Sequence, residues 1–138
     1  MPSPVYPVEA IQLLTDLVKG RKENARLLAS MGYPELALLY DGVNGNNGVV
    51  DILMKSKFVV LAAFLSAVTS ENKGQVQFLL KNAPHWAATI NFINKDLKAK
   101  AWLQKFNLGH YAILAEAIRK KLEDDEGSGL DILFRAPI

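Results

Sequence analysis

Two histidines are the side chains of this sequence best suited to proton transfer near neutral pH. His85 and His110 each lie at the start of an expected helix, and their rings would form a catalytic pair only if helix packing brought them together. A metal site would need a further ligand at i+3 or i+4 on the same face, and the next acid after His110 is Glu116, which is too far away. We therefore interpret both histidines as partly exposed residues of helical turns and expect no metal ion.

Other catalytic groups show no recognisable arrangement. The chain contains no cysteine, which excludes disulfides, thiolate zinc sites and a cysteine nucleophile. No serine lies in a Gly-x-Ser-x-Gly sequence, and the expected core holds no paired carboxylates. Residues distant in sequence can converge in a folded protein. These patterns nevertheless favour a protein that is not an enzyme and that needs no cofactor.

The segment Asp41–Gly48, Asp-Gly-Val-Asn-Gly-Asn-Asn-Gly, is the clearest interruption of the chain. Glycine and asparagine tolerate positive φ, so we predict a loop here. A phosphate-binding loop would end in Lys followed by Ser or Thr, which is missing. A calcium loop requires oxygen ligands at its third and fifth positions, where this sequence has Val43 and Gly45. We interpret the segment as a connector.

The charged residues are unevenly distributed. The net charge is +2, and residues 123–138 carry five acids and one base, so they sum to −4 and residues 1–122 sum to +6. A basic body with an acidic tail is typical of proteins that bind anionic partners, or of a tail that folds onto its own body. The candidate binding cations are Lys95, Lys98, Lys105, Arg119, Lys120 and Lys121, and a second basic cluster comprises Lys19, Arg21, Lys22 and Arg26.

Helices must position these side chains. Apolar residues recur at helical spacing through most of the chain, and we predict an all-α fold of about seven or eight helices. The segment 58–69 is apolar almost all round; its β-branched residues would allow a strand at 58–61, but its length and alanines favour a buried helix. The expected helical segments are 7–18, 22–31, 34–40, 49–54 (a short helix or a helical turn), 58–69, 73–81, 84–93, 94–106 and 110–122.

The ends of the expected helices are marked by particular residues. Pro34 and Pro84 suit the first turn of a helix, where the missing N–H costs nothing. Asn94 is the expected N-cap of the helix that follows it. The inward face of that helix is predicted to comprise Leu97, Ala101, Trp102 and Phe106.

We expect one helical domain over residues 1–122, followed by an acidic linker and a short apolar tail over 123–138. The apolar run Phe58–Val68 is too short to span a bilayer, and the N-terminus does not resemble a signal peptide. The sequence therefore predicts a cytoplasmic protein that does not bind membranes. The tail is predicted to dock, in cis or on a second copy as a homo-oligomer, through Leu130, Ile132, Leu133 and Phe134.

The segment 73–93, a helix followed by a turn and a second helix, has imperfect copies elsewhere. A displacement of 51 places Leu13 on Phe64, and one of 50 places Pro34 on Pro84. A displacement of 25 relates His85-Trp86-Ala87 to a partial copy, His110-Tyr111-Ala112. Because Tyr111 replaces Trp86 in the copy, we interpret Trp86 as a packing position. Repeated helical groups predict stacked helices.

The segments 23–32 and 71–80 resemble the asparagine-containing turn, and the passage from second to third helix, of armadillo/HEAT repeats. The resemblance covers about residues 8–93 and implies an armadillo-like stack of helical hairpins; an irregular helical bundle is the alternative. Separately, residues 108–118 are similar to the closing helix of sterile-alpha-motif domains. The armadillo resemblance implies a non-catalytic scaffold that binds another protein. A small basic domain that binds nucleic acid is the alternative function.

Overall fold

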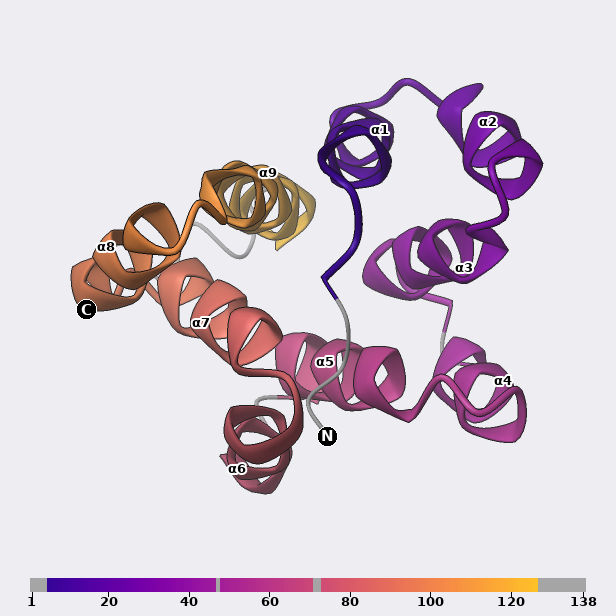
Figure 1. Ribbon diagram of the computed structural model, residues 1–138. Coiled ribbons are helices and arrows are strands. Elements are labelled where there is room, and N and C mark those ends of the chain that lie inside the picture. The colour runs from indigo at the N-terminus through magenta and orange to yellow at the C-terminus, as the bar shows by residue number, and fades with distance from the viewer. Residues whose placement is uncertain (1–4, 47, 71–72, 127–138) are drawn as a thin grey trace.

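The computed structural model describes residues 5–46, 48–70 and 73–126, and these residues form nine α-helices and no strand (Figure 1). The predicted all-α class is confirmed, whereas the prediction of seven or eight helices was too low for the described ranges. The helices are α1 (Val8–Val18), α2 (Asn24–Ser30), α3 (Pro34–Val43), α4 (Val49–Lys55), α5 (Val59–Ser70), α6 (Lys73–Asn82), α7 (Pro84–Ile93), α8 (Leu97–Lys105) and α9 (Gly109–Glu126).

The helices follow one another around a ring (Figure 1). The odd-numbered helices pack on one another in the order α1, α3, α5, α7 and α9, and α9 packs on α1 to close the ring. The even-numbered helices lie outside, mainly against the helices that precede and follow them in the chain. The first and last helices of the described chain are therefore neighbours.

The helices recur at a regular spacing along the chain. From α3 onward, those of the inner ring begin at 34, 59, 84 and 109, so the displacement from one helix pair to the next is 25 and the displacement of 50 spans two pairs. The predicted displacement of 51, which placed Leu13 on Phe64, is one position too long. A displacement of 50 places Leu14 on Phe64, and both of these residues are buried, whereas Leu13 is only half-buried. One buried position recurs in each inner helix: Ile11, Leu36, Leu61, Trp86 and Tyr111.

Several of the described turns between helices share one cap. The N–H of Phe58 donates to the carbonyl of Leu53 at 2.8 Å, and the residue between them in the turn, Lys57, has φ of 69°. A left-handed residue followed by a bond back across five positions is the Schellman motif. The motif recurs with Asn107 and Lys95 in the left-handed position. The backbone geometry of these turns therefore repeats even where the residue is not glycine.

Gly42 belongs to a helix and not to a loop. The prediction of a loop from residue 41 was wrong at its start, because α3 continues to Val43. Gly42 is buried, and a Cβ built on it would collide with the side chain of Leu65 on α5. The glycine therefore permits close packing of α3 on α5. The regular spacing of the inner helices is maintained through this region.

Three boundary and face predictions near the C-terminus were wrong. Asn94 caps the end of α7, and the N-cap of α8 is Asp96, whose carboxylate accepts the backbone N–H of Lys98 at 2.9 Å. The inward residues of α8 are Ala99 and Leu103, while most of the predicted face is exposed. Helix α9 continues four residues past the predicted end at 122, through Glu126. The prediction of one domain over 1–122 stays an expectation.

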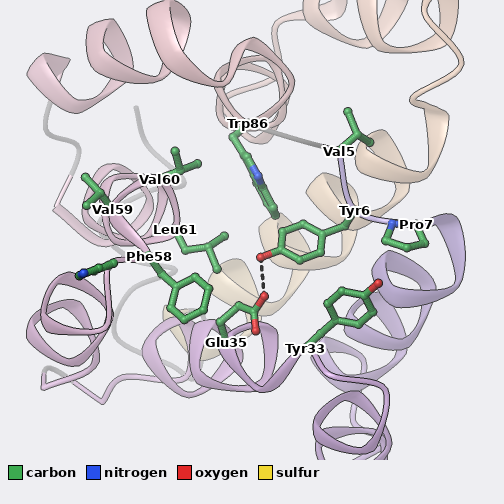
Figure 2. A pocket seen from close by; sticks show the side chains of 11 residues that line it. Val5, Tyr6, Pro7, Tyr33, Glu35, Phe58, Val59, Val60, Leu61 and Trp86 are labelled. Carbon is green, nitrogen blue, oxygen red and sulfur yellow. Dashed lines mark hydrogen bonds between the residues drawn. The ribbon is translucent and has the colours of Figure 1, made fainter. Parts of the chain in front are cut away.

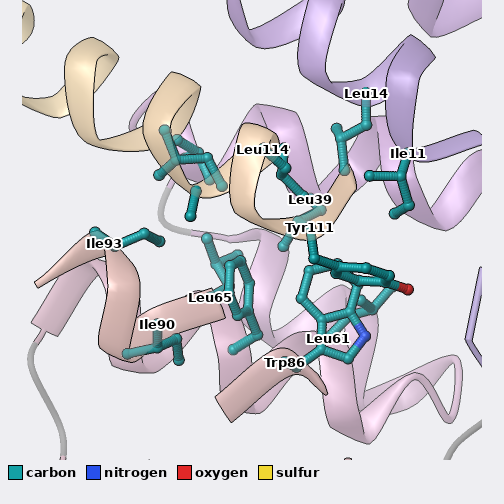
Figure 3. Close-up of a cluster of buried hydrophobic side chains, with 14 of the residues drawn as sticks. Ile11, Leu14, Leu39, Leu61, Leu65, Trp86, Ile90, Ile93, Tyr111 and Leu114 are labelled. Atoms are coloured by element: carbon teal, nitrogen blue, oxygen red, sulfur yellow. The ribbon is translucent and has the colours of Figure 1, made fainter. Parts of the chain in front are cut away.

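The core fills the centre of the ring (Figure 3). Trp86 is 1% exposed, and its ring centroid lies 4.6 Å from that of Phe64 and 5.1 Å from that of Tyr111. The interpretation of Trp86 as a packing position is confirmed. Burial of these large rings supplies much of the apolar contact among α5, α7 and α9.

Candidate functional site

A groove with a basic lining crosses the surface formed by the end of α1, the α7–α8 turn and α9. Its volume is about 920 Å³. Closure of the ring creates this surface, because it places the end of α1 beside α9. We define the basic groove by its cations Lys19, Lys95, Lys100, Arg119 and Lys120, together with Phe92, Leu97, Ile113, Glu116, Ala117 and Glu123.

A buried phenyl ring holds two of these cations in place. The Nζ atom of Lys100 lies 5.5 Å from the centroid of Phe92, and the guanidinium carbon of Arg119 lies 5.7 Å from the same centroid. The face of an aromatic ring attracts cations at this range. The floor of the basic groove is therefore an aromatic ring covered by two positive charges.

The basic groove keeps a positive charge after its own ion pairs are counted. Lys100 lies 3.9 Å from Glu116 and Arg119 lies 3.7 Å from Glu123, with all four side chains substantially exposed. Exposed pairs of this kind contribute little to stability. The lining has five cations and two acids, so 5 − 2 leaves +3. Among the described residues, the other three lysines of the lining form no ion pair.

Two large apolar side chains stand exposed between these charges. Leu97 is 72% exposed and Ile113 is 55% exposed, and both line the basic groove. Single exposed apolar residues are common on protein surfaces. Their shared position in a positively charged groove is more specific, because it offers an apolar contact surrounded by cations.

The positive surface continues into a neighbouring hollow of about 730 Å³. Lys19 and Lys120 line both depressions, and Lys22, Lys121 and Asp124 line only the second. The two depressions therefore form one basic surface that runs along α9 from the α7–α8 turn toward the α1–α2 turn.

The structure brings together only part of the predicted binding set. Lys95, Arg119 and Lys120 line the basic groove, and Lys121 lines the adjoining hollow. Lys98 and Lys105 are exposed on α8 and line neither depression. The predicted tail anchors Leu130, Ile132, Leu133 and Phe134 lie outside the described residues.

Sequence reasoning missed Lys19 as part of the same site as the C-terminal cations. It placed Lys19 in a separate N-terminal cluster, and nothing local indicates that α1 packs on α9. The predicted binding set also lacks Lys100, which lines the basic groove. The spacing between Phe92 and Arg119 carries no recognisable motif, so their contact across α7 and α9 is visible only in the structure.

The histidines form a separate cluster around Tyr111. The ring centroids of His85 and His110 lie 5.2 Å and 4.8 Å from that of Tyr111. His85 is only 3% exposed, so the interpretation of both residues as partly exposed was wrong for His85. Burial, and secondarily the charge of His110, lower the pKa of His85 to about 4. Burial also lowers the pKa of His110, and the backbone of Tyr6 partly offsets that effect.

This cluster has the arrangement of packed neutral rings. Neither Nε2 atom finds a hydrogen-bond partner within the described chain. No three His, Asp or Glu side chains of the described residues group closely enough to hold a metal ion. Both histidines therefore pack against Tyr111 with lowered pKa values, and no carboxylate of the described residues hydrogen-bonds to either ring.

Among the described helices, none has both the length and the apolar character needed to cross a membrane. The chain matches no family model, and no curated protein or solved structure shows significant similarity to it.

Proposed function

We propose that this protein is a non-catalytic interaction module whose basic groove binds an acidic segment of a partner protein. The observation that carries the proposal is the combination of a +3 lining with two exposed apolar side chains, Leu97 and Ile113, in one groove. Acidic side chains of the partner would meet the lysines, and one of its apolar side chains would contact Leu97 and Ile113. The cations would mainly set the association rate and the orientation of the partner.

Two features favour a protein partner over nucleic acid. Glu116 and Glu123 lie among the cations and would repel a continuous row of phosphates. Phe92 is buried beneath Lys100 and Arg119, so it offers no free face on which a base could stack. A peptide can place its acids between these two glutamates, whereas the phosphate spacing of a nucleic acid is regular.

The recurrence of helix pairs supports the same role. Regularly spaced units, each an inner and an outer helix, build a rigid frame on which surface residues of different units are held in register. Stacked helical units typically bind partners through such composite surfaces. The armadillo-like resemblance belongs to this proposal, as does the description of the protein as a helical-repeat scaffold.

A peptide-binding assay tests the proposal. The probe is a fluorescein-labelled 12-residue peptide that alternates Glu with Leu, and the comparison probes are a Glu/Ser peptide and a 20-nucleotide single-stranded DNA. We expect the Glu/Leu peptide to bind best, as measured by fluorescence anisotropy, with an affinity that falls as NaCl rises from 50 to 300 mM because exposed charges are screened.

Matched lysine variants locate the binding surface. Lys95→Gln/Lys120→Gln removes two charges of the basic groove, and Lys98→Gln/Lys105→Gln removes two exposed charges outside it. We expect the first pair to weaken peptide binding by roughly 5- to 30-fold, at about 0.5–1 kcal/mol per charge, and the second to leave it nearly unchanged. Equal effects of the two pairs, or preferential binding of the DNA, would overturn the proposal.

A further inference from the structure

A further cavity lies where residues 5–7 pass α3, α5 and α7 (Figure 2). Its volume is about 580 Å³. Small-molecule sites in proteins typically occupy about 300–1,000 Å³. We call it the aromatic cavity and define it by Tyr6, Tyr33, Glu35, Phe58, Leu61 and Trp86 in its lining.

The aromatic cavity contains a carboxylate that is more than nine-tenths buried. Glu35 is 7% exposed, and its Oε2 atom accepts a hydrogen bond of 2.8 Å from the hydroxyl of Tyr6. No other described residue donates to Glu35, and no described cation pairs with it. Burial of a carboxylate is costly without a compensating charge or further donors. Among the described residues, Glu35 therefore has one donor and no cation as partners, and its side chain lines the cavity, where a ligand can reach it.

Aromatic side chains surround this carboxylate. The ring centroid of Tyr6 lies 5.5 Å from that of Tyr33 and 6.4 Å from that of Trp86, and both pairs are edge to face. Figure 2 shows Tyr6 between Trp86 and Tyr33, with Phe58 on the other side of Glu35. Aromatic faces beside a carboxylate attract organic ammonium ions through the ring quadrupole. The hydrophobic part of such an ion would contact Leu61 and the neighbouring valines.

The tyrosine that contacts Glu35 is held as a donor. Burial, and then the hydrogen bond to Glu35, raise the pKa of Tyr6. Its backbone N–H also donates to the hydroxyl of Tyr111 at 3.0 Å, which fixes residue 6 against α9. The Tyr6 hydroxyl thus occupies Oε2 and leaves the other oxygen of Glu35 to a ligand.

One lysine also lines the aromatic cavity, but it does not neutralise Glu35. Lys57 is exposed, lies in the α4–α5 turn with φ of 69°, and forms no ion pair with Glu35. A cationic ligand would be repelled weakly by Lys57 and attracted strongly by the closer, buried carboxylate. Removal of Glu35 should therefore weaken the binding of such a ligand, whereas removal of Lys57 should not weaken it.

From these contacts we propose that the aromatic cavity binds a small organic ammonium ion of the arylalkylamine type, with an apolar ring attached to the ammonium group by a short chain. The ammonium group donates to Glu35 and lies against the rings of Tyr6 and Tyr33, which are only partly buried. This site lies apart from the basic groove and shares no lining residue with it. Binding of an ammonium ion is therefore an activity additional to the proposed binding of an acidic segment.

Phenethylamine, 2-phenylethanol and phenylacetate test the charge requirement on the full chain. The three probes share a phenyl ring and differ in carrying a cation, a neutral hydroxyl or an anion. We expect isothermal titration calorimetry to show phenethylamine binding at least about tenfold more tightly than the alcohol, which corresponds to one charge-assisted hydrogen bond. Absence of phenethylamine binding, or equal or tighter binding of either other probe, would overturn the proposal.

Three variants identify the residues responsible. Glu35→Gln keeps the shape and an acceptor for Tyr6, and should weaken phenethylamine binding about tenfold or more. Lys57→Gln should leave phenethylamine binding equal or up to about threefold tighter, because a like charge is removed. Val59→Trp, a substitution at an exposed lining residue that leaves Glu35 in place, should weaken binding of all three probes.

Circular dichroism and thermal unfolding establish that each variant is folded before it is titrated. If Glu35→Gln does not fold, Lys57→Gln and Val59→Trp still decide the proposal. Tighter or unchanged amine binding by Lys57→Gln, together with weaker binding by Val59→Trp, supports the proposed amine site. Weaker amine binding in Lys57→Gln, or undiminished binding in Val59→Trp, would contradict it.

Discussion

The basic groove and the aromatic cavity use charge in opposite ways. In the basic groove, five cations, three of them exposed and two partly exposed, and two acids line a surface open to water. In the aromatic cavity, a single carboxylate is buried among rings and accepts one hydrogen bond from a described residue. Exposed charges are screened and individually weak, whereas a buried charge interacts strongly with whatever reaches it. The groove is therefore suited to a large partner with many contacts, and the cavity to a small ligand with one strong contact.

The two sites also differ in their relation to the stability of the fold. The aromatic cavity shares Trp86 and Leu61 with the core, while the cations of the basic groove lie on helix surfaces and turns. Changes near the cavity should therefore affect folding, and changes to the lysines of the groove should affect binding alone.

Truncation of the shared tryptophan should have the largest effect. Trp86→Ala removes a fully buried ring that contacts Phe64 and Tyr111, and we expect a loss of about 3–5 kcal/mol in the free energy of unfolding. Urea denaturation monitored by circular dichroism measures it. Trp102→Ala is the matched control, because Trp102 is only partly buried and should cost less. Equal losses would show that the core is not centred on Trp86.

Acidification should destabilise the histidine side of the core. The pKa of His85 falls from an unfolded value of 6.5 to about 4, so the unfolded chain binds a proton that the folded chain excludes. The contribution of neutral His85 to the free energy of unfolding is therefore fully present above about pH 6.5. It is lost progressively as the pH falls toward 4. The loss is at most about 3 kcal/mol.

Urea denaturation at pH 7 and pH 4.5 measures this dependence. His85→Phe retains a ring in the same place and should lose that part of the pH dependence, while acids elsewhere contribute equally to both proteins. An equal change in the free energy of unfolding between pH 7 and pH 4.5 in the variant and the parent protein would show that protonation of His85 does not destabilise the fold.

Addition of one methyl group between α3 and α5 should cost less than these changes. In Gly42→Ala the new Cβ must displace the side chain of Leu65, and we expect a loss of about 1–3 kcal/mol. Gly48→Ala is the control, since its Cβ would meet only ordinary contact distances at an exposed position. Thermal unfolding of both variants is the measurement. A neutral Gly42→Ala would mean that α3 and α5 can separate freely.

The smallest effect on stability is expected in the basic groove. Lys95→Gln/Lys120→Gln removes two charges without an ion pair in the described chain, and the free energy of unfolding should change by less than about 0.5 kcal/mol. Thermal unfolding of the variant tests it. A clear gain in stability would indicate repulsion within the groove, which is itself typical of a surface that awaits an acidic partner. A clear loss would show that these lysines stabilise the fold.

Helix positions were largely predictable from the sequence because their signals are local. Apolar spacing and the prolines at 34 and 84 placed most of the helices, and the copy of His85-Trp86 at His110-Tyr111 correctly identified Trp86 as a packing residue. The prediction failed where a local signal was outweighed by packing. Gly42 resembles a residue of a loop but lies in a helix, because its lack of a side chain accommodates Leu65.

The face of α8 illustrates a second limit. Leu97 and Phe106 are apolar and helically spaced, which favours burial, yet both are exposed because α8 lies outside the inner ring and packs mainly against α7 and α9. Hydrophobic spacing identifies a candidate face but does not determine which neighbours are available to cover it.

The sequence by itself determined the all-α class, most helix positions, the excess of positive charge over residues 1–122 and the role of Trp86 in packing. These properties depend on composition or on residues within a few turns of one another. Only the tertiary structure decided which distant residues share a site. Packing of α1 on α9 brings Lys19 to Lys120, and the path of residues 5–7 brings Tyr6 to Glu35. Such contacts depend on how helices pack across the ring, for which short-range spacing carries no signal.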